Sequence, residues 1–238
     1  MASREDLLRR LAQRIRDIEA SERPHFHDVV SLGIAGLEQA LPDGRLPAGS
    51  LVELLAAAEG AGAWTLALMM ARHACGAGKA LVVADPARRF YPPAAARLGV
   101  ELRRAIVIRP RDPRYTLAAV TQSLRCAAVG AVLGAFDNLP AFDFRRLQLA
   151  AELGGGIGFL LRPATALRVP SFAAVRLRIA PLVSADAHRR IQVDVVRLRG
   201  GKSGQSLIVE LDHETGDVRV SAALAPATTP ARRPRLSG

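Results

Sequence analysis

A loop of small residues between a predicted strand and a predicted helix has the spacing of a phosphate-binding site. The stretch from Leu51 to Lys79 reads LVELLAAAEGAGAWTLALMMARHACGAGK. In a phosphate-binding loop, G-x-x-x-x-G-K-[ST], backbone N–H groups surround the phosphates, the lysine reaches the β- and γ-phosphates, and the serine or threonine hydroxyl binds Mg²⁺. The strand, the loop and a helix predicted from about Trp64 reproduce this layout.

The residue types that carry this chemistry are absent from the loop. Counted back from the helix, Gly62 takes the second glycine position and Ala57 the first, while Ala63 stands at the lysine position and Trp64 at the serine or threonine position. Helix N-termini attract anions whatever their side chains, which leaves weak nucleotide binding open, but we expect no ATP cofactor and no enzyme activity. The degenerate loop comprises Glu59, Gly60, Ala61, Gly62, Ala63, Trp64 and Thr65.

The bulk composition indicates one domain of ordinary size with short additions. The chain has 238 residues and a formal net charge of +11, nearly all from arginine, since Lys79 and Lys202 are its only lysines. Clustered cations bind nucleic acid by releasing counterions, but genome composition alone also produces arginine-rich chains, so direct DNA binding stays open. No apolar run approaches the roughly 18 residues of a membrane span, and we expect a cytoplasmic, nucleoid-associated protein. Cys75 and Cys126 lie in apolar helical patterns, which predicts buried free thiols.

Apolar runs of strand length alternate with helical patterns through the middle of the chain. Nearly continuous apolar strands that alternate with helices form parallel sheets covered on both faces. The sequence therefore predicts an α/β fold with a mostly parallel sheet flanked by helices. The runs are LVELL at 51–55, ALVVAD at 80–85, AIVIRP at 105–110, AVLGAFD at 131–137 and IGFLLRP at 157–163, with helices near 64–77, 91–98, 115–127 and 142–153.

The two ends of the chain have different patterns. From Val175 the apolar period changes to two, which predicts antiparallel C-terminal strands that extend the same sheet. Residues 3–20 predict an amphipathic helix, which packs either on its own domain or on a partner; its apolar face includes Leu7, Leu11, Ile15 and Ile18. We predict three parts: an N-terminal helix at 1–22, an α/β domain at 23–222 and a disordered basic tail at 223–238.

Two segments carry a resemblance to the RecA family. SLGIAGLEQALPDGRLPAGSLVEL at 31–54 resembles the entry to the RecA P-loop strand, with Glu38 in place of an aspartate and Arg45 in place of a second glycine. FYPPAAARLGVE at 90–101 resembles the segment that follows the second core strand. The resemblance covers roughly residues 30–220 and implies a RecA-like P-loop core.

A third segment indicates which group of RecA-like proteins the chain resembles. FRRLQLAAELGGGIGFLLRP at 144–163 closely resembles the ImuA family, RecA-like accessory proteins of bacterial mutagenic translesion synthesis. The resemblance implies a non-catalytic adaptor of the SOS response to DNA damage. Such an adaptor joins an ImuB-type Y-family polymerase homologue and an error-prone replicative-type DNA polymerase, with RecA and weakly held DNA left open as further partners.

When the RecA motif residues are mapped onto this sequence, the resemblance implies a nucleotide site that does not hydrolyse ATP. Asp137, which ends AVLGAFD, is the Walker-B-like candidate for Mg²⁺, and the alternative is a carboxylate that caps a turn. The catalytic glutamate of RecA lies two residues beyond the position of Asp85 and maps onto Ala87. The DNA-binding loops of RecA shrink to NLPAFDF and ATALRVPS. We predict no metal site, no ATP hydrolysis and no strand exchange.

Five arginines are candidate contacts for DNA or a partner. The first two adjoin Phe90 and Tyr91, and cations beside aromatic rings can stack on a base or on a partner's side chain. The other three lie near the shortened loops, and each of the five has the alternative of a solvated or helix-capping cation. We expect any DNA binding through them to be weak and independent of sequence. The five are Arg88, Arg89, Arg145, Arg146 and Arg162.

Two other functions compete with the adaptor. A SulA-type cell-division inhibitor also fits the degenerate loop, but such proteins are usually shorter and lack an extension like residues 185–222. An active ATPase of the RecA/KaiC class is opposed by Ala63, Trp64 and Ala87.

The N-terminal helix generates the first prediction. An amphipathic helix binds a partner's groove through apolar side chains spaced by four residues. Leu11→Asp with Ile15→Asp should weaken binding to the ImuB-type partner in a pull-down and leave the melting temperature unchanged. A sharply lowered melting temperature would show instead that the stripe packs on its own domain.

Overall fold

The computed structural model describes residues 28–76, 78–183, 188–201, 203–211 and 218–226. The predicted N-terminal helix, with Leu7, Leu11, Ile15 and Ile18, lies outside the described residues, and so does the predicted tail beyond Pro226. No helix in the described part is both long enough and apolar enough to cross a membrane.

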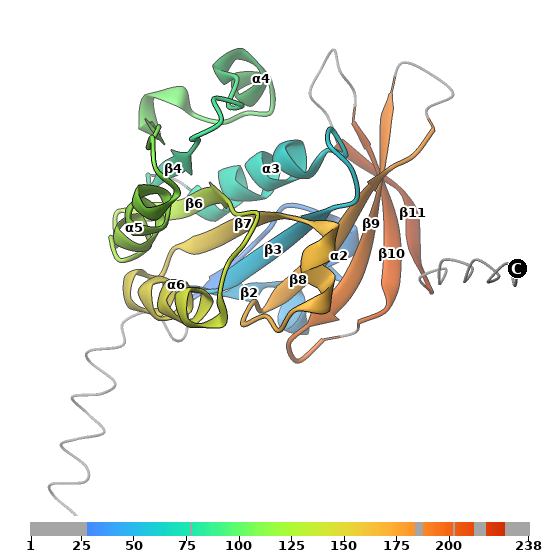
Figure 1. Ribbon diagram of the computed structural model, residues 1–238. Helices are drawn as coiled ribbons and strands as arrows, with labels where there is room; N and C mark the ends of the chain where they lie inside the picture. The colour runs from blue at the N-terminus through green and yellow to red at the C-terminus, as the bar shows by residue number, and fades with distance from the viewer. Residues whose placement is uncertain (1–27, 77, 184–187, 202, 212–217, 227–238) are drawn as a thin grey trace, which may run out of the picture.

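The described residues form a nine-stranded sheet in the order β11-β10-β9-β8-β3-β7-β6-β4-β5 (Figure 1). The six strands from β8 to β5 are mutually parallel, and β9, β10 and β11 continue the sheet in antiparallel pairing. This confirms the predicted α/β class. The strands are β3 (Leu51–Ala56), β4 (Ala80–Ala84), β5 (Ala105–Ile108), β6 (Val129–Ala135), β7 (Ile157–Pro163), β8 (Val175–Pro181), β9 (Arg189–Leu198), β10 (Gln205–Leu211) and β11 (Val218–Pro226).

Helices cover both faces of the parallel strands. One core cluster joins the sheet to α3 (Ala63–Cys75) and α4 (Pro92–Arg97), and the other joins it to α5 (Pro113–Leu124) and α6 (Ala141–Gly154). The strands β3, β4, β6 and β7 are buried on both faces, as their continuous apolar runs predict, whereas Ile106 on the edge strand β5 is 52% exposed. Two short turns of 3₁₀-helix, η2 (Leu102–Arg104) and η3 (Ala164–Arg168), complete the connections.

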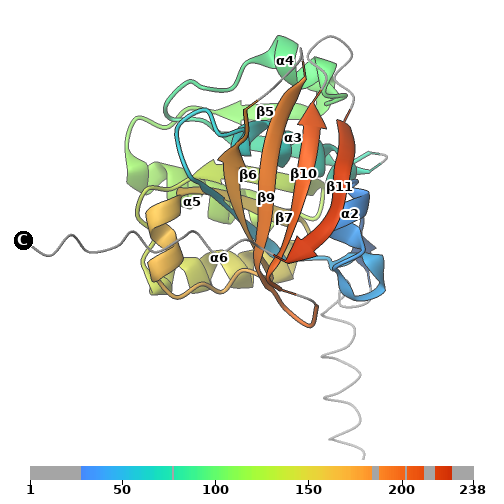
Figure 2. The same cartoon turned by 90° about the vertical axis from the view of Figure 1, so that its right-hand side faces the viewer.

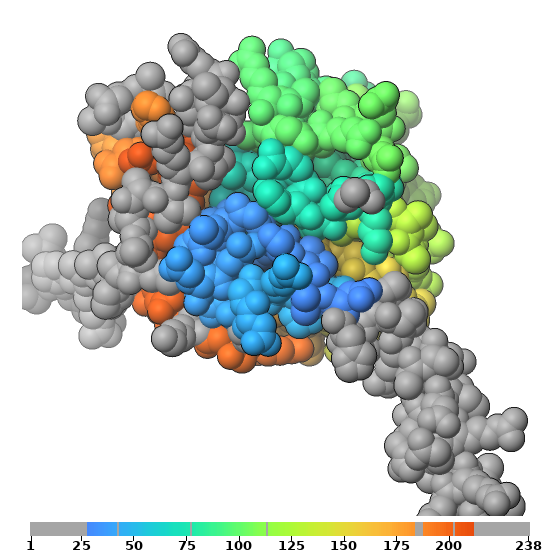
Figure 3. Space-filling view, turned by 180° about the vertical axis from the view of Figure 1, so that it is seen from behind, coloured from blue at the N-terminus to red at the C-terminus, as the bar shows by residue number. Residues whose placement is uncertain are grey.

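The segment before β3 covers the α3 face beside the antiparallel strands (Figure 3). It consists of β1 (Val29–Val30), α2 (Ala35–Glu38), η1 (Pro42–Gly44) and β2 (Leu46–Pro47), which pairs with β1. The Glu38 carboxylate accepts hydrogen bonds from the Ser31 hydroxyl and from the Leu32 and Gly33 N–H groups. Burial alone would raise the pKa of Glu38, but these bonds outweigh it and lower the pKa. The Ser-x-Gly and glutamate signature therefore closes this turn.

The C-terminal strands differ from the sequence prediction in two details. β8 pairs in parallel with β3, so the antiparallel extension begins at β9 rather than at Val175. β11 continues to Pro226, so residues 223–226 lie in the sheet, beyond the expected boundary at 222. Figure 2 shows β9, β10 and β11 side by side, with α2 close to β11.

The two cysteines differ in exposure. Cys75 is partly buried at the end of α3, and burial raises the pKa of its thiol to about 11. Cys126 is exposed just after α5, so the prediction of burial is wrong for this residue. The apolar pattern of the sequence runs on past Leu124, where α5 ends, so it does not show that Cys126 lies in the connection to β6.

A buried ionic triad connects three adjacent central strands. Glu53 on β3 accepts a hydrogen bond from Arg162 Nη1 on β7 at 2.6 Å and one from Arg176 Nε on β8 at 2.5 Å. Arg176 Nη2 also donates to the Ala166 carbonyl in η3 at 2.7 Å. The side chains of Glu53, Arg162 and Arg176 are 0%, 2% and 9% exposed. The triad therefore links the first strand of the core to both of its neighbours and to η3.

Removal of the carboxylate should be costly because it leaves two buried guanidinium groups without a counter-charge. Glu53→Ala should lower the free energy of unfolding by about 3–5 kcal/mol in urea denaturation. The matched control is Glu101→Ala, which breaks a surface pair with Arg104 whose side chains are 51% and 46% exposed; it should cost less than about 1 kcal/mol. Similar losses in the two variants would contradict the structural role of the triad.

Candidate functional site

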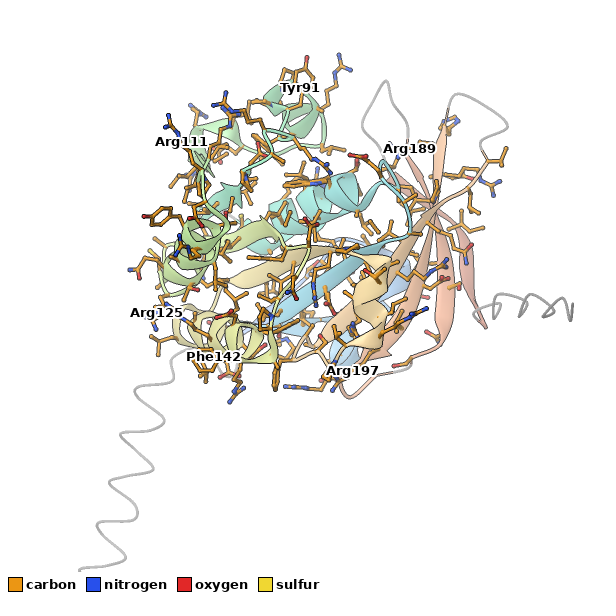
Figure 4. The ribbon with its side chains drawn as sticks, viewed as in Figure 1. Tyr91, Arg111, Arg125, Phe142, Arg189 and Arg197 are labelled. Atoms are coloured by element: carbon orange, nitrogen blue, oxygen red, sulfur yellow. The ribbon has the colours of Figure 1, made fainter. Side chains whose placement is uncertain are left out.

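The degenerate loop lies at the carboxyl ends of β3, β6 and β7, where it borders a cavity of about 550 Å³. We call this the loop cavity. Its wall includes residues 56–65, and Arg89, Asp137 and Arg189 reach it from other segments. Crevices at the carboxyl edge of an α/β sheet are the usual ligand sites of such folds. In Figure 4, Arg189 lies at the end of β9 nearest this loop.

The C-terminal part of the sheet holds the loop in place. The Ala57 N–H donates to the Ile179 carbonyl of β8 at 2.8 Å. Gly62 is the N-cap of α3 with a φ of 96°, and a Cβ there would collide with the Ile191 side chain of β9. Trp64, at the serine or threonine position, packs against the core. The loop is thus shaped by packing against β8 and β9.

Charged side chains border the loop cavity at the Glu59–Arg89 ion pair and at Asp137. Glu59 pairs with Arg89 at 2.8 Å, with side chains 81% and 56% exposed. Asp137 is exposed just after β6. The sequence prediction placed Arg89 and the loop in separate segments, and the structure brings them together. No group of three or more histidine, cysteine, aspartate or glutamate side chains within the described ranges is arranged to hold a metal ion.

The turn after β4 is organised by Asp85. Its carboxylate is fully buried and accepts hydrogen bonds from the Arg89 N–H at 2.7 Å and the Phe90 N–H at 3.0 Å. Arg109 Nε lies 3.8 Å from the same carboxylate. A carboxylate used in this way stabilises the turn and is not free to orient a water molecule. Ala87, which has no acid group, lies within the same turn.

The three arginines near the shortened loops have different positions. Arg162 belongs to the buried triad, with a side chain only 2% exposed, so it is unsuited to contact an external phosphate. Arg145 and Arg146 are exposed on α6, and the Arg145 guanidinium lies 6.0 Å from the centre of the Phe172 ring. Neither residue lines the loop cavity.

A second cavity, of about 680 Å³, lies at the same edge beyond Asp137. We call it the arginine cavity, because its wall includes Arg88, Arg109, Arg111 and Arg114. It lies at the carboxyl ends of β4, β5 and β6, and it shares Ala135 and Asp137 with the loop cavity. Sequence reasoning identified only Arg88 of these four. Arg109 and Arg111 could have been identified from the sequence, because they directly follow an apolar strand and residues that follow parallel strands lie at the carboxyl edge of the sheet.

Comparison with known proteins gives relatives that agree with this arrangement. Protein ImuA of Caulobacter vibrioides, in strains NA1000 / CB15N and ATCC 19089 / CIP 103742 / CB 15, is 28% identical over 199 residues. The match covers 74% of this chain and 81% of the Caulobacter protein. The chain is therefore similar to the ImuA proteins over most of its length. The ImuA match extends through most of both proteins, as expected for two proteins that share a domain of this size.

The chain is also similar to a second group of proteins, over a shorter stretch. Cell division inhibitor SulA of Yersinia pestis and of Yersinia pseudotuberculosis is 32% identical over 81 residues. That match covers 34% of this chain and 48% of the SulA proteins. No family model matches the chain.

The geometry of the loop cavity predicts no ATP turnover. Ala63 offers no charge to the γ-phosphate, and Ala87, at the position mapped to the catalytic glutamate, has no carboxylate to orient water. We expect purified protein to show no ATPase activity above background, and Ala63→Lys with Trp64→Thr should not restore it. A turnover near 1 s⁻¹, at the low end for enzymes, that persists through further purification would contradict this expectation.

Proposed function

We propose that this protein is a non-catalytic adaptor of damage-induced mutagenesis. In this role it binds an ImuB-type Y-family polymerase homologue and an error-prone replicative-type DNA polymerase during translesion synthesis. The observation that carries the proposal is the ImuA match, which extends over 81% of the relative, compared with 48% for SulA. The role in the SOS response and the two polymerase partners come from the family resemblance.

The loop cavity supports a binding role over a catalytic one. Phosphoryl transfer depends on cations that neutralise phosphate charge and on a group that positions the nucleophile. The loop supplies neither, since Ala63 and Trp64 occupy the positions of the lysine and the hydroxyl residue. The fold is retained because β8 and β9 fix the loop without a nucleotide.

An exposed apolar stripe on α6 supports a protein partner. Phe142, Leu149 and Leu153 are 79%, 49% and 67% exposed. Their spacings of seven and four residues place them on one side of the helix. Clustered exposed apolar side chains mark protein interaction sites more often than isolated ones do. Figure 4 shows Phe142 projecting away from the body of the protein.

A pull-down with defined partners tests the adaptor role. The tagged full chain, added to extract from DNA-damaged cells, should recover the ImuB-type homologue and the replicative-type polymerase. Leu149→Asp with Leu153→Asp should reduce recovery at least about tenfold, as expected for loss of interface contacts that contribute more than about 1.4 kcal/mol. The matched control is Leu102→Asp, a 39% exposed leucine in η2, which should bind like the wild type. Unchanged recovery in the α6 variant would remove this helix from the interface.

The SulA similarity gives the alternative function a test of its own. A division inhibitor should bind the tubulin-like division protein and cause filamentous growth when overproduced. An adaptor should do neither, and its deletion should abolish damage-induced mutation. Filamentation together with normal induced mutation in the deletion strain would favour the inhibitor over the adaptor.

A further inference from the structure

The arginine cavity has the features of a built ligand site and is separate from the loop that the sequence singled out. Three connections meet there: the turn after β4, the β5–α5 loop and the β6–α6 loop. Its floor is apolar and includes Phe136 and Leu117. Gly134 makes room for this floor, because a Cβ there would lie 2.8 Å from Phe136 Cε2. A volume of about 680 Å³ lies within the range of small-molecule pockets.

The backbone places Arg88 at the cavity in a strained conformation. Arg88 has a φ of 56°, a left-handed value that residues other than glycine seldom adopt. The buried Asp85 carboxylate fixes the turn through the N–H groups of Arg89 and Phe90. Such strain persists only where the surroundings enforce it, and it clusters at functional sites. The Asp85 turn thus holds Arg88 in the cavity wall.

The four arginines differ in how far their charges are already paired. Arg114 pairs with Asp112 at 2.9 Å, and Arg109 lies 3.8 Å from Asp85. Arg88 and Arg111 form no ion pair with any residue in the described ranges. The cavity therefore presents two guanidinium groups that are available to an anionic ligand.

A buried hydroxyl in the cavity wall provides a second, independent observation. Thr116 in the first turns of α5 lines the cavity and is only 2% exposed. Its Oγ1 has no hydrogen-bond partner among the residues that the structure describes, although its N–H is bonded to the Asp112 carbonyl at 3.3 Å. Buried polar groups in proteins are nearly always paired. An unpaired hydroxyl in the wall of an arginine-rich cavity indicates a group that a ligand oxygen satisfies.

The opposite wall offers hydrogen-bond acceptors that suit a base better than an acidic peptide. Asp137, Asn138 and Asp143 line that side, and the ionised side chains of an acidic peptide have no hydrogen to donate to them. The same groups can accept hydrogen bonds from the amino groups of a base. Single-stranded nucleic acid is typically bound by cations interleaved with aromatic rings, and Phe136 supplies an aromatic ring to this cavity.

We propose that the arginine cavity binds a nucleotide unit of single-stranded DNA, with the phosphate held by Arg88 and Arg111 and the base above the floor of Phe136 and Leu117. Asp137 and Asn138 face the edge of the base. This goes beyond the adaptor function, and it places DNA contact in one cavity rather than in arginines scattered over the surface.

Fluorescence anisotropy of the full chain with fluorescein-labelled (dC)₂₀, whose bases carry amino groups, tests the site. Arg88→Gln with Arg111→Gln should weaken binding at least tenfold at about 50 mM salt. It should also reduce the slope of log K against log salt concentration by about 0.7, the value expected when one phosphate of a single strand is no longer neutralised. The matched control is Arg103→Gln with Arg125→Gln, which removes the same charge from the opposite ends of β5 and α5. Figure 4 shows Arg111 and Arg125 at the two ends of α5. Equal losses in the two variants would overturn the proposal.

Two further measurements distinguish DNA binding in the arginine cavity from DNA binding elsewhere and from binding of an acidic polypeptide. Thr116→Val should weaken binding about fivefold, the effect of one lost hydrogen bond, and leave the melting temperature unchanged or raised, because it removes an unpaired buried hydroxyl. Wild-type DNA affinity in this variant would count against the site. Poly-glutamate that displaces (dC)₂₀ at equal charge concentration would also overturn the proposal in favour of an acidic polypeptide ligand. These assays use the purified chain without the polymerase partners. The DNA-binding proposal can therefore fail while the adaptor function holds, and the adaptor function can fail while DNA binding holds.

Discussion

The ion triad of Glu53, Arg162 and Arg176 is the constraint on which the centre of this structure depends. It joins β3 to β7 on one side and to β8 on the other, at 2.6 and 2.5 Å. Buried charges are tolerated only when they are paired and hydrogen-bonded. The register of these three strands must therefore bring one carboxylate between two guanidinium groups. Any slip by one residue would turn these charges to the opposite face of the sheet.

That register also sets the shape of the carboxyl edge. β8 accepts a hydrogen bond from the loop at Ala57, and β9 packs Ile191 against Gly62. The loop therefore keeps its form through neighbouring strands, whereas an active nucleotide site would use its lysine and hydroxyl to hold a ligand. Such an arrangement explains how a P-loop layout can survive without the residues of phosphoryl transfer. Asp137 stands between the two cavities of this edge.

Much of the fold could be predicted from local sequence. The parallel strands come from continuous apolar runs, because a strand buried on both faces needs apolar side chains throughout. β11 was predicted to end too early, because AALAP lacks the alternation that marks VRVSA. The direction of β8 was also missed, since an alternating pattern says nothing about whether the neighbouring strand is parallel. Cys126 was wrongly predicted to be buried, because α5 ends at Leu124 and Cys126 lies beyond it in the connection to β6.

The sequence by itself determined the α/β class, the loss of the lysine and hydroxyl positions, and the resemblance that led to the ImuA family. These follow from residue types at short spacings, which a single chain displays directly. Only the tertiary structure decided that Arg162 is buried against Glu53 while Arg88, Arg109, Arg111 and Arg114 share one cavity. The physical reason is that parallel strands bring residues 25 positions apart to one edge, and charge pairing across strands depends on register. An arginine-rich sequence gives no sign of which arginines will be paired and which will be left for a ligand.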